Sequence, residues 1–209
     1  MRNYRPIAAL LLATCVLTLT VAAQAQPVVQ KPVWPPIGAT WTYQETSTGV
    51  LGSGTRSKTF RRIPDEKLEG TAWIATAQDN DVFLYNNKAA AIAIVRNGTV
   101  FLRYEQPARN FPWPLQVGAR WSMDTRFKVS VSPDMQTGHM DGVVEAYESV
   151  TTPAGTFDCF RIHVTTGETN HTRWWTPTLG VNVRSVTDVR GANQATGHQE
   201  MVLTSFKAR

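Results

Sequence analysis

Regular alternation of apolar and polar residues between Phe157 and Thr166 is the feature that most constrains the fold. In an extended strand, Phe160, Ile162 and Val164 would face one side and the residues between them the other. A Pro-Ala-Gly turn at residues 153–155 precedes this run. Proline presets φ and glycine tolerates conformations that other residues avoid, so both residues favour a reversal of the chain. The pattern predicts strands joined by tight turns.

The same two-residue period recurs along most of the chain, and no amphipathic helix of useful length is found. Asn97-Gly98 between apolar runs is a strong hairpin signal. We therefore predict an all-β fold, a single antiparallel meander over 37–209 that curves into a barrel, half-barrel or sandwich to protect its edges. The predicted strands are 41–44, 55–63, 71–78, 82–85, 89–95, 99–104, 120–132, 142–150, 157–166, 169–176, 181–189 and 200–206, with 133–138 as a loop.

Two of these strands begin with the same short motif. Residues 37–41 read Ile-Gly-Ala-Thr-Trp and residues 117–121 read Val-Gly-Ala-Arg-Trp, and each copy follows a proline cluster. We interpret both as a tight glycine turn before a strand whose tryptophan packs inward. The repetition allows two similar halves, 37–110 and 111–209, within the one domain.

The first 25 residues have the pattern of a signal peptide. Arg2 and Arg5 precede an apolar run, and Ala23-Gln24-Ala25 is a small-x-small cleavage site, so we expect cleavage after Ala25. Residues 26–36 contain four prolines and are predicted to form a flexible lead-in. The mature chain would then have no transmembrane segment and would be periplasmic or secreted in a Gram-negative bacterium.

A lipoprotein is the competing interpretation of this segment. Leu12-Ala13-Thr14-Cys15 faintly resembles a lipobox, which would make Cys15 a lipidated N-terminus. Thr14 is a poor residue before such a cysteine, and the apolar run continues beyond it, so cleavage after Ala25 is favoured.

Charge and cysteine content exclude several functional classes. Without Arg2 and Arg5, 19 basic residues face 16 acidic ones, a net charge of +3 (21 − 2 − 16), and the basic residues are scattered. This distribution does not fit a nucleic-acid-binding protein. Cys159 is the only cysteine after Ala25, so the mature chain cannot form an internal disulfide. We interpret Cys159 as a small buried apolar residue.

Few residues suggest a reaction or a metal site. The sequence contains none of the common local motifs of hydrolases, metalloproteases or phosphate-binding loops, so we assign no catalytic residue and no cofactor. His139 and Asp141 could share a strand face and are weak candidates for a metal or an acid-base pair, but a solvated loop-to-strand transition is the favoured explanation. Glu145 and Glu148 are expected on opposite faces, which argues against a hydrolytic carboxylate pair.

Adjacent tryptophans give the one candidate for ligand binding. Trp174 and Trp175 would place one indole on each face of a strand. One indole is then expected in the core, and the other could stack on a sugar or cover a lipid. Packing of both indoles in the core or at the barrel rim is the favoured interpretation.

The second half of the chain also resembles a known family. Residues 153–158 (Pro-Ala-Gly-Thr-Phe-Asp), the pair Trp174-Trp175 with Pro177, and the upstream Val117-Gly118 with Trp121 resemble an uncharacterised family of exported bacterial β-proteins, a domain of unknown function that is sometimes described as TapB-like. The resemblance covers 111–209. It implies an envelope protein with a curved antiparallel sheet and carries no established activity or functional residues.

Three functions are compatible with these features. The first is a non-enzymatic envelope protein that binds an apolar or amphipathic, lipid-like molecule in the concave face of the sheet. The second is a periplasmic assembly partner that presents a strand edge or sheet face to another envelope protein, for which 55–63 is the candidate edge. The third, a hydrolase with a site assembled from distant residues, has no local motif to support it.

Overall fold

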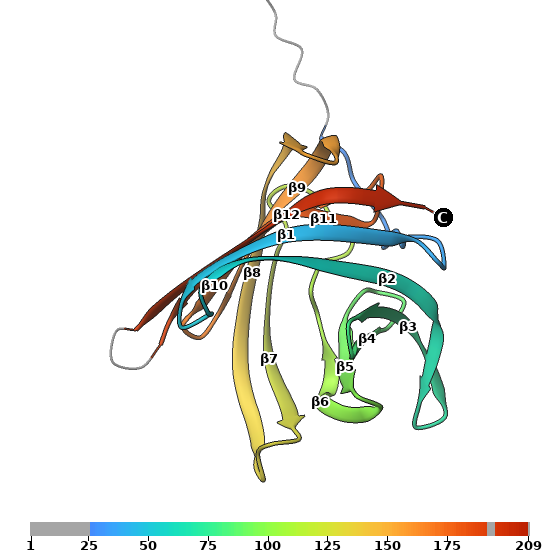
Figure 1. Ribbon diagram of the computed structural model, residues 1–209, viewed down its shortest axis with the longest axis vertical. Coiled ribbons are helices and arrows are strands. Elements are labelled where there is room, and N and C mark those ends of the chain that lie inside the picture. The colour runs from blue at the N-terminus through green and yellow to red at the C-terminus, as the bar shows by residue number, and fades with distance from the viewer. Residues whose placement is uncertain (1–25, 192–194, 209) are drawn as a thin grey trace, which may run out of the picture.

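The computed structural model describes residues 26–191 and 195–208, and twelve antiparallel strands lie within them (Figure 1). The predicted signal peptide and Cys15 lie outside the described residues. The strands are β1 (Thr40–Gly49), β2 (Gly54–Leu68), β3 (Thr71–Gln78), β4 (Asp81–Tyr85), β5 (Ala91–Arg96), β6 (Thr99–Ala108), β7 (Arg120–Val129), β8 (Met135–Thr152), β9 (Gly155–Thr166), β10 (Thr169–Thr176), β11 (Val181–Arg190) and β12 (Thr196–Lys207).

The strands form a closed barrel. Each strand pairs with its neighbours in sequence, and β1 pairs with β12 from Thr40↔Lys207 to Gly49↔Gly197, so the two ends of the meander lie side by side in Figure 1. The prediction of an all-β antiparallel meander is confirmed, and of the three shapes left open the structure has the barrel. No helix in the described part of the chain is long and apolar enough to cross a membrane.

Closure changes the interpretation of residues 55–63. This segment lies in β2, which pairs with β1 on one side and with β3 on the other. The prediction that it forms a guarded sheet edge is therefore wrong, because a closed barrel satisfies the backbone groups that an edge would expose.

Both copies of the glycine motif form the same local structure. Gly38 and Gly118 have φ of 94° and 86°, and each donates its N–H to a residue on the neighbouring strand, Arg62 and Val144, at 2.8 Å. The tryptophans that follow, Trp41 and Trp121, are each 6% exposed and belong to the core. A glycine turn followed by an inward tryptophan is confirmed at both places.

Several element boundaries differ from the sequence prediction. The strand predicted at 120–132 ends at Val129. Two other strands are longer than predicted because pairing continues across residues that were expected to stop it. The segment 133–138 was predicted as a loop, but β8 begins at Met135, which pairs with Lys128. β2 continues through Pro64, where a register shift between Ile63 and Glu66 removes the need for the proline's missing N–H.

The apolar interior is divided into separate clusters. One contains Phe160, Ile162, Val164 and Trp175, confirming the predicted inward face of the 157–166 strand. A second gathers around Trp41 and Tyr43, and a third, around Leu84 and Ile92, lies under the short strands. Separate clusters leave space between them, and that space is the site described next.

Candidate ligand-binding cavity

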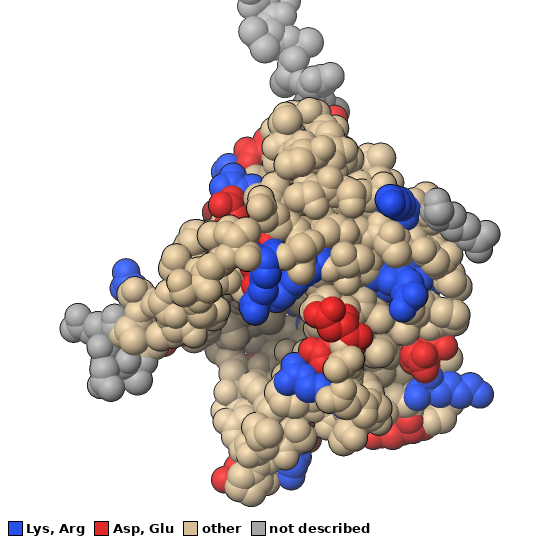
Figure 2. Space-filling view, viewed as in Figure 1, with Lys and Arg blue, Asp and Glu red and all other residues tan. Residues whose placement is uncertain are grey.

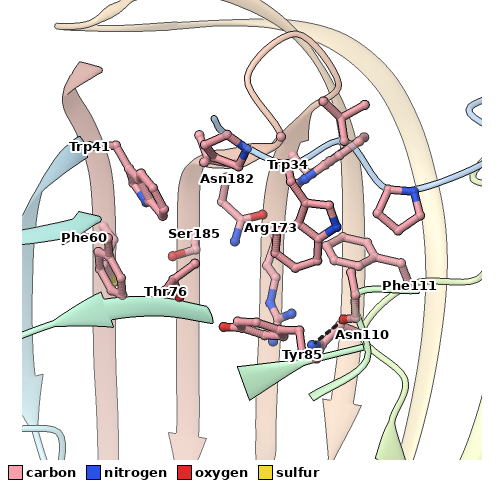
Figure 3. Close-up of a pocket in the computed structure, with 18 of the residues that line it drawn as sticks. Trp34, Trp41, Phe60, Thr76, Tyr85, Asn110, Phe111, Arg173, Asn182 and Ser185 are labelled. Atoms are coloured by element: carbon pink, nitrogen blue, oxygen red, sulfur yellow. Dashed lines mark hydrogen bonds between the residues drawn. The ribbon is translucent and has the colours of Figure 1, made fainter. Parts of the chain in front are cut away.

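A cavity of about 250 Å³ lies inside the barrel between the apolar clusters. Strands β1 to β4 form one part of its wall and β10 to β12 another. Its aromatic lining includes Trp34, Trp41, Phe60, Phe111, Trp113 and Trp175 (Figure 3). Because twelve alternating strands enclose a wide interior, the inward side chains do not fill it completely, and the unfilled part is apolar on most sides.

The lead-in before β1 forms part of this wall. Pro32, Val33 and Trp34 line the cavity, and the Trp34 ring lies 5.5 Å from the Tyr85 ring. Backbone hydrogen bonds of 3.0 and 2.8 Å join Val29 to Leu115 and hold the segment beside the loop before β7. The predicted flexibility of residues 26–36 stays a prediction, but these contacts place the segment over the cavity.

Aromatic rings from distant parts of the chain meet at one side of the cavity. Trp175 lies 5.8 Å from both Phe111 and Trp113, measured between ring centroids, and 6.5 Å from Phe160. Tilted and edge-on contacts at these distances stabilise a rigid aromatic surface. Phe111 and Trp113 come from the loop between β6 and β7, so no local sequence pattern indicated that they belong to this wall.

The charged residue in the lining of the cavity is Arg173, which projects from β10 towards Tyr85 in Figure 3. None of the ion pairs within residues 26–191 and 195–208 includes it. Among the residues drawn in Figure 3, no hydrogen bond reaches its guanidinium. Arg173 is therefore a cation inside the barrel without a carboxylate from the described chain.

The groups closest to Arg173 in electrostatic terms are neutral. Burial lowers the pKa of Arg173, and the hydroxyls of Tyr85 and Tyr104 act in the opposite direction. Burial also raises the pKa of both tyrosines, so they remain phenols at neutral pH. Burial and the charge of Arg173 lower the pKa of His171 to about 4, so this histidine is uncharged as well. A guanidinium stays protonated in proteins, so the cavity has a fixed positive charge.

The two adjacent tryptophans lie in different surroundings. Trp175 is 4% exposed and lines the cavity. Trp174 lies outside the lining, where its indole N–H donates to the Glu148 carboxylate at 2.7 Å and the Arg184 guanidinium lies 4.8 Å from its ring. Of these two adjacent tryptophans, only Trp175 is in position to contact a molecule in the cavity.

His139 and Asp141 do not line the cavity and lie on exposed parts of β8. Nδ1 of His139 lies 2.7 Å from Asp124, and Nε2 lies 3.2 Å from both Asp141 and Ser122. The hydrogen bond with Asp124, and then the charge of Asp141, raise the pKa of His139. The order Ser-His-Asp resembles that of a nucleophilic triad, but the side chains are solvated and do not line the cavity between the apolar clusters. Within the described residues, no cluster of three His, Cys, Asp or Glu side chains is arranged to hold a metal ion.

The carboxylates of β8 correct one sequence prediction. Glu145 and Glu148 were expected on opposite strand faces, yet Arg161 binds both, at 2.9 and 3.0 Å. A register shift between Val144 and Ala146 inserts one residue and brings the two side chains to the same face. The two carboxylates share one arginine, so they form a structural ion cluster.

Charged side chains on the outer surface are mixed in sign. Figure 2 shows Lys and Arg beside Asp and Glu around a hollow near the middle of the face in view. Many of them are paired, as in Arg96 with Asp81 at 2.8 Å and Arg184 with Glu200 at 2.7 Å. On this face, the basic residues therefore stand beside acidic ones.

Comparison with solved structures found similar chains at low identity. A candidate lipoprotein from Parabacteroides distasonis is 16% identical, with 86% of this chain and 99% of the other covered and a TM-score of 0.42. A candidate exported protein with a YmcC-like fold from Bacteroides fragilis is 13% identical, with 85% and 99% covered and a TM-score of 0.46. The hypothetical lipoprotein YmcC from Escherichia coli is 12% identical, with 79% and 83% covered and a TM-score of 0.36.

Comparison with curated proteins returned no match. A protein-family comparison matched residues 109–188, a stretch that runs from the loop before β7 into β11. This stretch contains the Pro-Ala-Gly turn and the Trp174-Trp175 pair, so it overlaps most of the region, 111–209, on which the predicted resemblance rested. Residues 109–188 of this chain match the DUF3108-like family, and the resemblance to an uncharacterised β-protein family is confirmed.

Proposed function

We propose that the protein is a non-enzymatic binding protein of the bacterial envelope that holds a small apolar or amphipathic molecule inside its barrel. The observation that carries this proposal is the aromatic-lined cavity of about 250 Å³. Ligand pockets in proteins are concave, largely apolar, contain a few polar groups and usually measure roughly 300–1,000 Å³. The volume is slightly below this range, which favours a compact ligand or a single short hydrocarbon chain.

Two further features support binding over simple packing. Protein interiors are close-packed, so a partly open hollow of about 250 Å³ is space that the inward side chains leave unfilled. The space is also bordered by loops and by the lead-in, through Trp34 and Trp113, where a ligand could enter without breaking the barrel. The signal-peptide pattern of residues 1–25 supports the proposed location in the periplasm or outside the cell.

A periplasmic assembly role has less support. The strand edge on which it rested is paired on both sides, so β-strand addition at 55–63 would require the barrel to open. A protein surface could still recognise a partner through its loops, but no feature of the described residues favours this over the cavity.

The experiment that tests the proposal is native mass spectrometry of the protein purified from a bacterial periplasm, before and after extraction with organic solvent. We expect extra mass that extraction removes. The extracted protein should then bind octan-1-ol, a short amphipathic probe, with quenching or enhancement of tryptophan fluorescence.

Paired tryptophan variants show whether the probe binds in this cavity. Trp34→Ala and Trp175→Leu each remove part of the lining and should weaken octan-1-ol binding by about tenfold, because a large aromatic contact contributes roughly 1–2 kcal/mol. Trp174→Leu is the matched control, since its indole lies outside the lining, and should leave the affinity unchanged. A bare polypeptide that also fails to bind octan-1-ol would refute the proposed function.

A further inference from the structure

Arg173 is partly buried in the cavity wall, and its surroundings differ from those of Arg62, an arginine that the barrel buries. Arg62 is 6% exposed, and its guanidinium donates to the carbonyl of Ala75 at 2.9 Å and pairs with Asp65 at 2.7 Å. Arg173 lines the cavity and takes part in none of the ion pairs of the described chain. The same fold therefore compensates one interior arginine with its own residues and leaves the other free.

An uncompensated interior charge is costly. Withdrawing part of a guanidinium from water without an anion beside it is unfavourable, because the lost hydration is not replaced by an ion pair. The chain contains 16 acidic residues, and a barrel of alternating strands offers many inward positions for one of them. A positive charge that faces a cavity is explained if the missing anion comes from a ligand.

The surroundings of Arg173 define what that anion must be. Arg173 carries one positive charge. The titratable groups that interact with it electrostatically, Tyr85, Tyr104 and His171, are neutral at pH 7. Thr76 and Ser185 add hydroxyl groups to the same wall (Figure 3). One monoanion would balance this site, whereas a dianion such as a phosphate monoester would leave a negative charge unpaired. A carboxylate also matches the planar guanidinium with two parallel hydrogen bonds.

Most of the remaining lining of the cavity is apolar. Aromatic rings, including Trp34, Phe60 and Trp175, line the space around the arginine. A ligand that pairs with the Arg173 guanidinium and also contacts the aromatic wall has one charged end and a hydrocarbon body. We propose that Arg173 is an anion-binding residue that selects monoanionic amphipathic carboxylates, whose charged end pairs with the guanidinium while the hydrocarbon part lies among the aromatic side chains. This inference rests on the proposed function and adds the chemical class of the ligand.

The test compares probes of equal length and different charge on the extracted full mature protein. Octanoate, octan-1-ol and octylammonium are titrated by calorimetry at pH 7.5, where Arg173 is charged. We expect octanoate to bind at least about tenfold more tightly than octan-1-ol, since a hydrogen bond to a charged group is among the stronger ones. Octylammonium should not bind, because its charge repels the guanidinium.

Variants of Arg173 assign the preference to this residue. Arg173→Met keeps an unbranched side chain without the charge, so octanoate binding should fall at least tenfold while octan-1-ol binding stays within about twofold of wild type or improves. Arg184→Met is the matched control: it removes a cation that the structure places beside Trp174, outside the cavity lining, and should change neither affinity. If Arg173→Met does not fold, Arg173→Lys retains a positive charge and should keep the preference for octanoate with a lower affinity.

The outcomes separate this inference from the proposed function. Equal binding of octanoate and octan-1-ol by wild type would overturn the inference and leave the proposed function standing. An octanoate preference that survives in Arg173→Met, or that Arg184→Met removes, would also overturn it. Failure of all three probes to bind would instead count against the proposed function itself.

Discussion

Trp121 of β7 lies across Gly142 of β8, its partner in the strand register, and a Cβ atom at residue 142 would overlap the indole ring. Trp121 is one of the two tryptophans that follow a glycine turn, and its indole N–H donates to the carbonyl of Arg109 at 3.2 Å. The glycine therefore leaves room for the ring beside the neighbouring strand, and the hydrogen bond of Trp121 connects the barrel wall to the loop before β7.

Gly142→Ala is expected to destabilise the protein by roughly 1–3 kcal/mol, the usual cost of overpacking a filled interior. Urea denaturation monitored by tryptophan fluorescence measures the change. Trp121→Leu combined with Gly142→Ala serves as the control, because the double variant removes the overlap. Its loss of stability should be smaller than the sum of the two single losses. Additive losses would show that the ring does not limit residue 142.

Gly180 holds the lead-in against the barrel. It has φ of 72° and stands so close to the backbone of Val33 that an added Cβ would overlap the Val33 carbonyl. Gly180→Ala should displace the segment that carries Trp34, which lowers stability by more than the roughly 1–2 kcal/mol expected from backbone conformation alone and weakens octan-1-ol binding. Denaturation and fluorescence titration measure both effects.

Gly52→Ala is the matched control for that change. Gly52 also has a positive φ, 98°, but a Cβ there would meet nothing within 4 Å. Gly52→Ala should lower the stability only by the amount expected from backbone conformation, and it should bind octan-1-ol as tightly as wild type. Equal effects of the two substitutions on binding would mean that contact with Val33 does not shape the cavity.

His171 should make stability depend on pH. Its folded pKa of about 4 lies below the ordinary value of 6.5, chiefly because of burial and then the charge of Arg173. In the range between these values the unfolded chain binds more protons, so stability falls as the pH falls. The expected loss from this group between pH 7 and pH 5 is about 2 kcal/mol. Urea denaturation at the two pH values measures it, and His171→Gln should lose correspondingly less stability on acidification.

His139 provides an internal comparison of opposite sign. Its pKa is raised by the Asp124 hydrogen bond and the Asp141 charge, so its contribution is present below pH 6.5 and is lost as the pH rises through the folded pKa. His139→Gln should therefore increase the loss of stability on acidification. If both histidine variants shifted the pH dependence in the same direction, the placement of His171 inside the barrel would be contradicted. Octan-1-ol binding should not change in His139→Gln.

Cys159 should be unreactive in the folded protein. The prediction of a buried residue is confirmed, since Cys159 is 0% exposed, and burial raises the pKa of its thiol to about 12. The reactive thiolate is then almost absent at pH 8. A maleimide reagent followed by mass spectrometry should label the protein in urea and leave it unmodified in buffer. Rapid labelling in buffer would contradict the packing around β9.

Local sequence pattern predicted much of the secondary structure because its signals act over a few residues. The runs 71–78 and 169–176 match β3 and β10 at both ends. The Asn97-Gly98 turn and the Pro-Ala-Gly turn lie where the pattern placed them, between paired strands. Errors occurred where a register shift changed the pattern, as between Ile63 and Glu66, since a bulge depends on the partner strand and leaves little trace in one strand alone.

The sequence by itself determined the alternation of inward and outward residues, the glycine turns before Trp41 and Trp121, and the burial of Cys159. The pairing of β1 with β12 decided that the meander closes, and closure brought Tyr85, Phe111 and Arg173 around one space. These residues lie far apart along the chain, so no short-range pattern connects them. The absence of an acidic partner for Arg173 in the described residues is likewise a property of the assembled barrel, because an ion pair depends on which side chains meet in space.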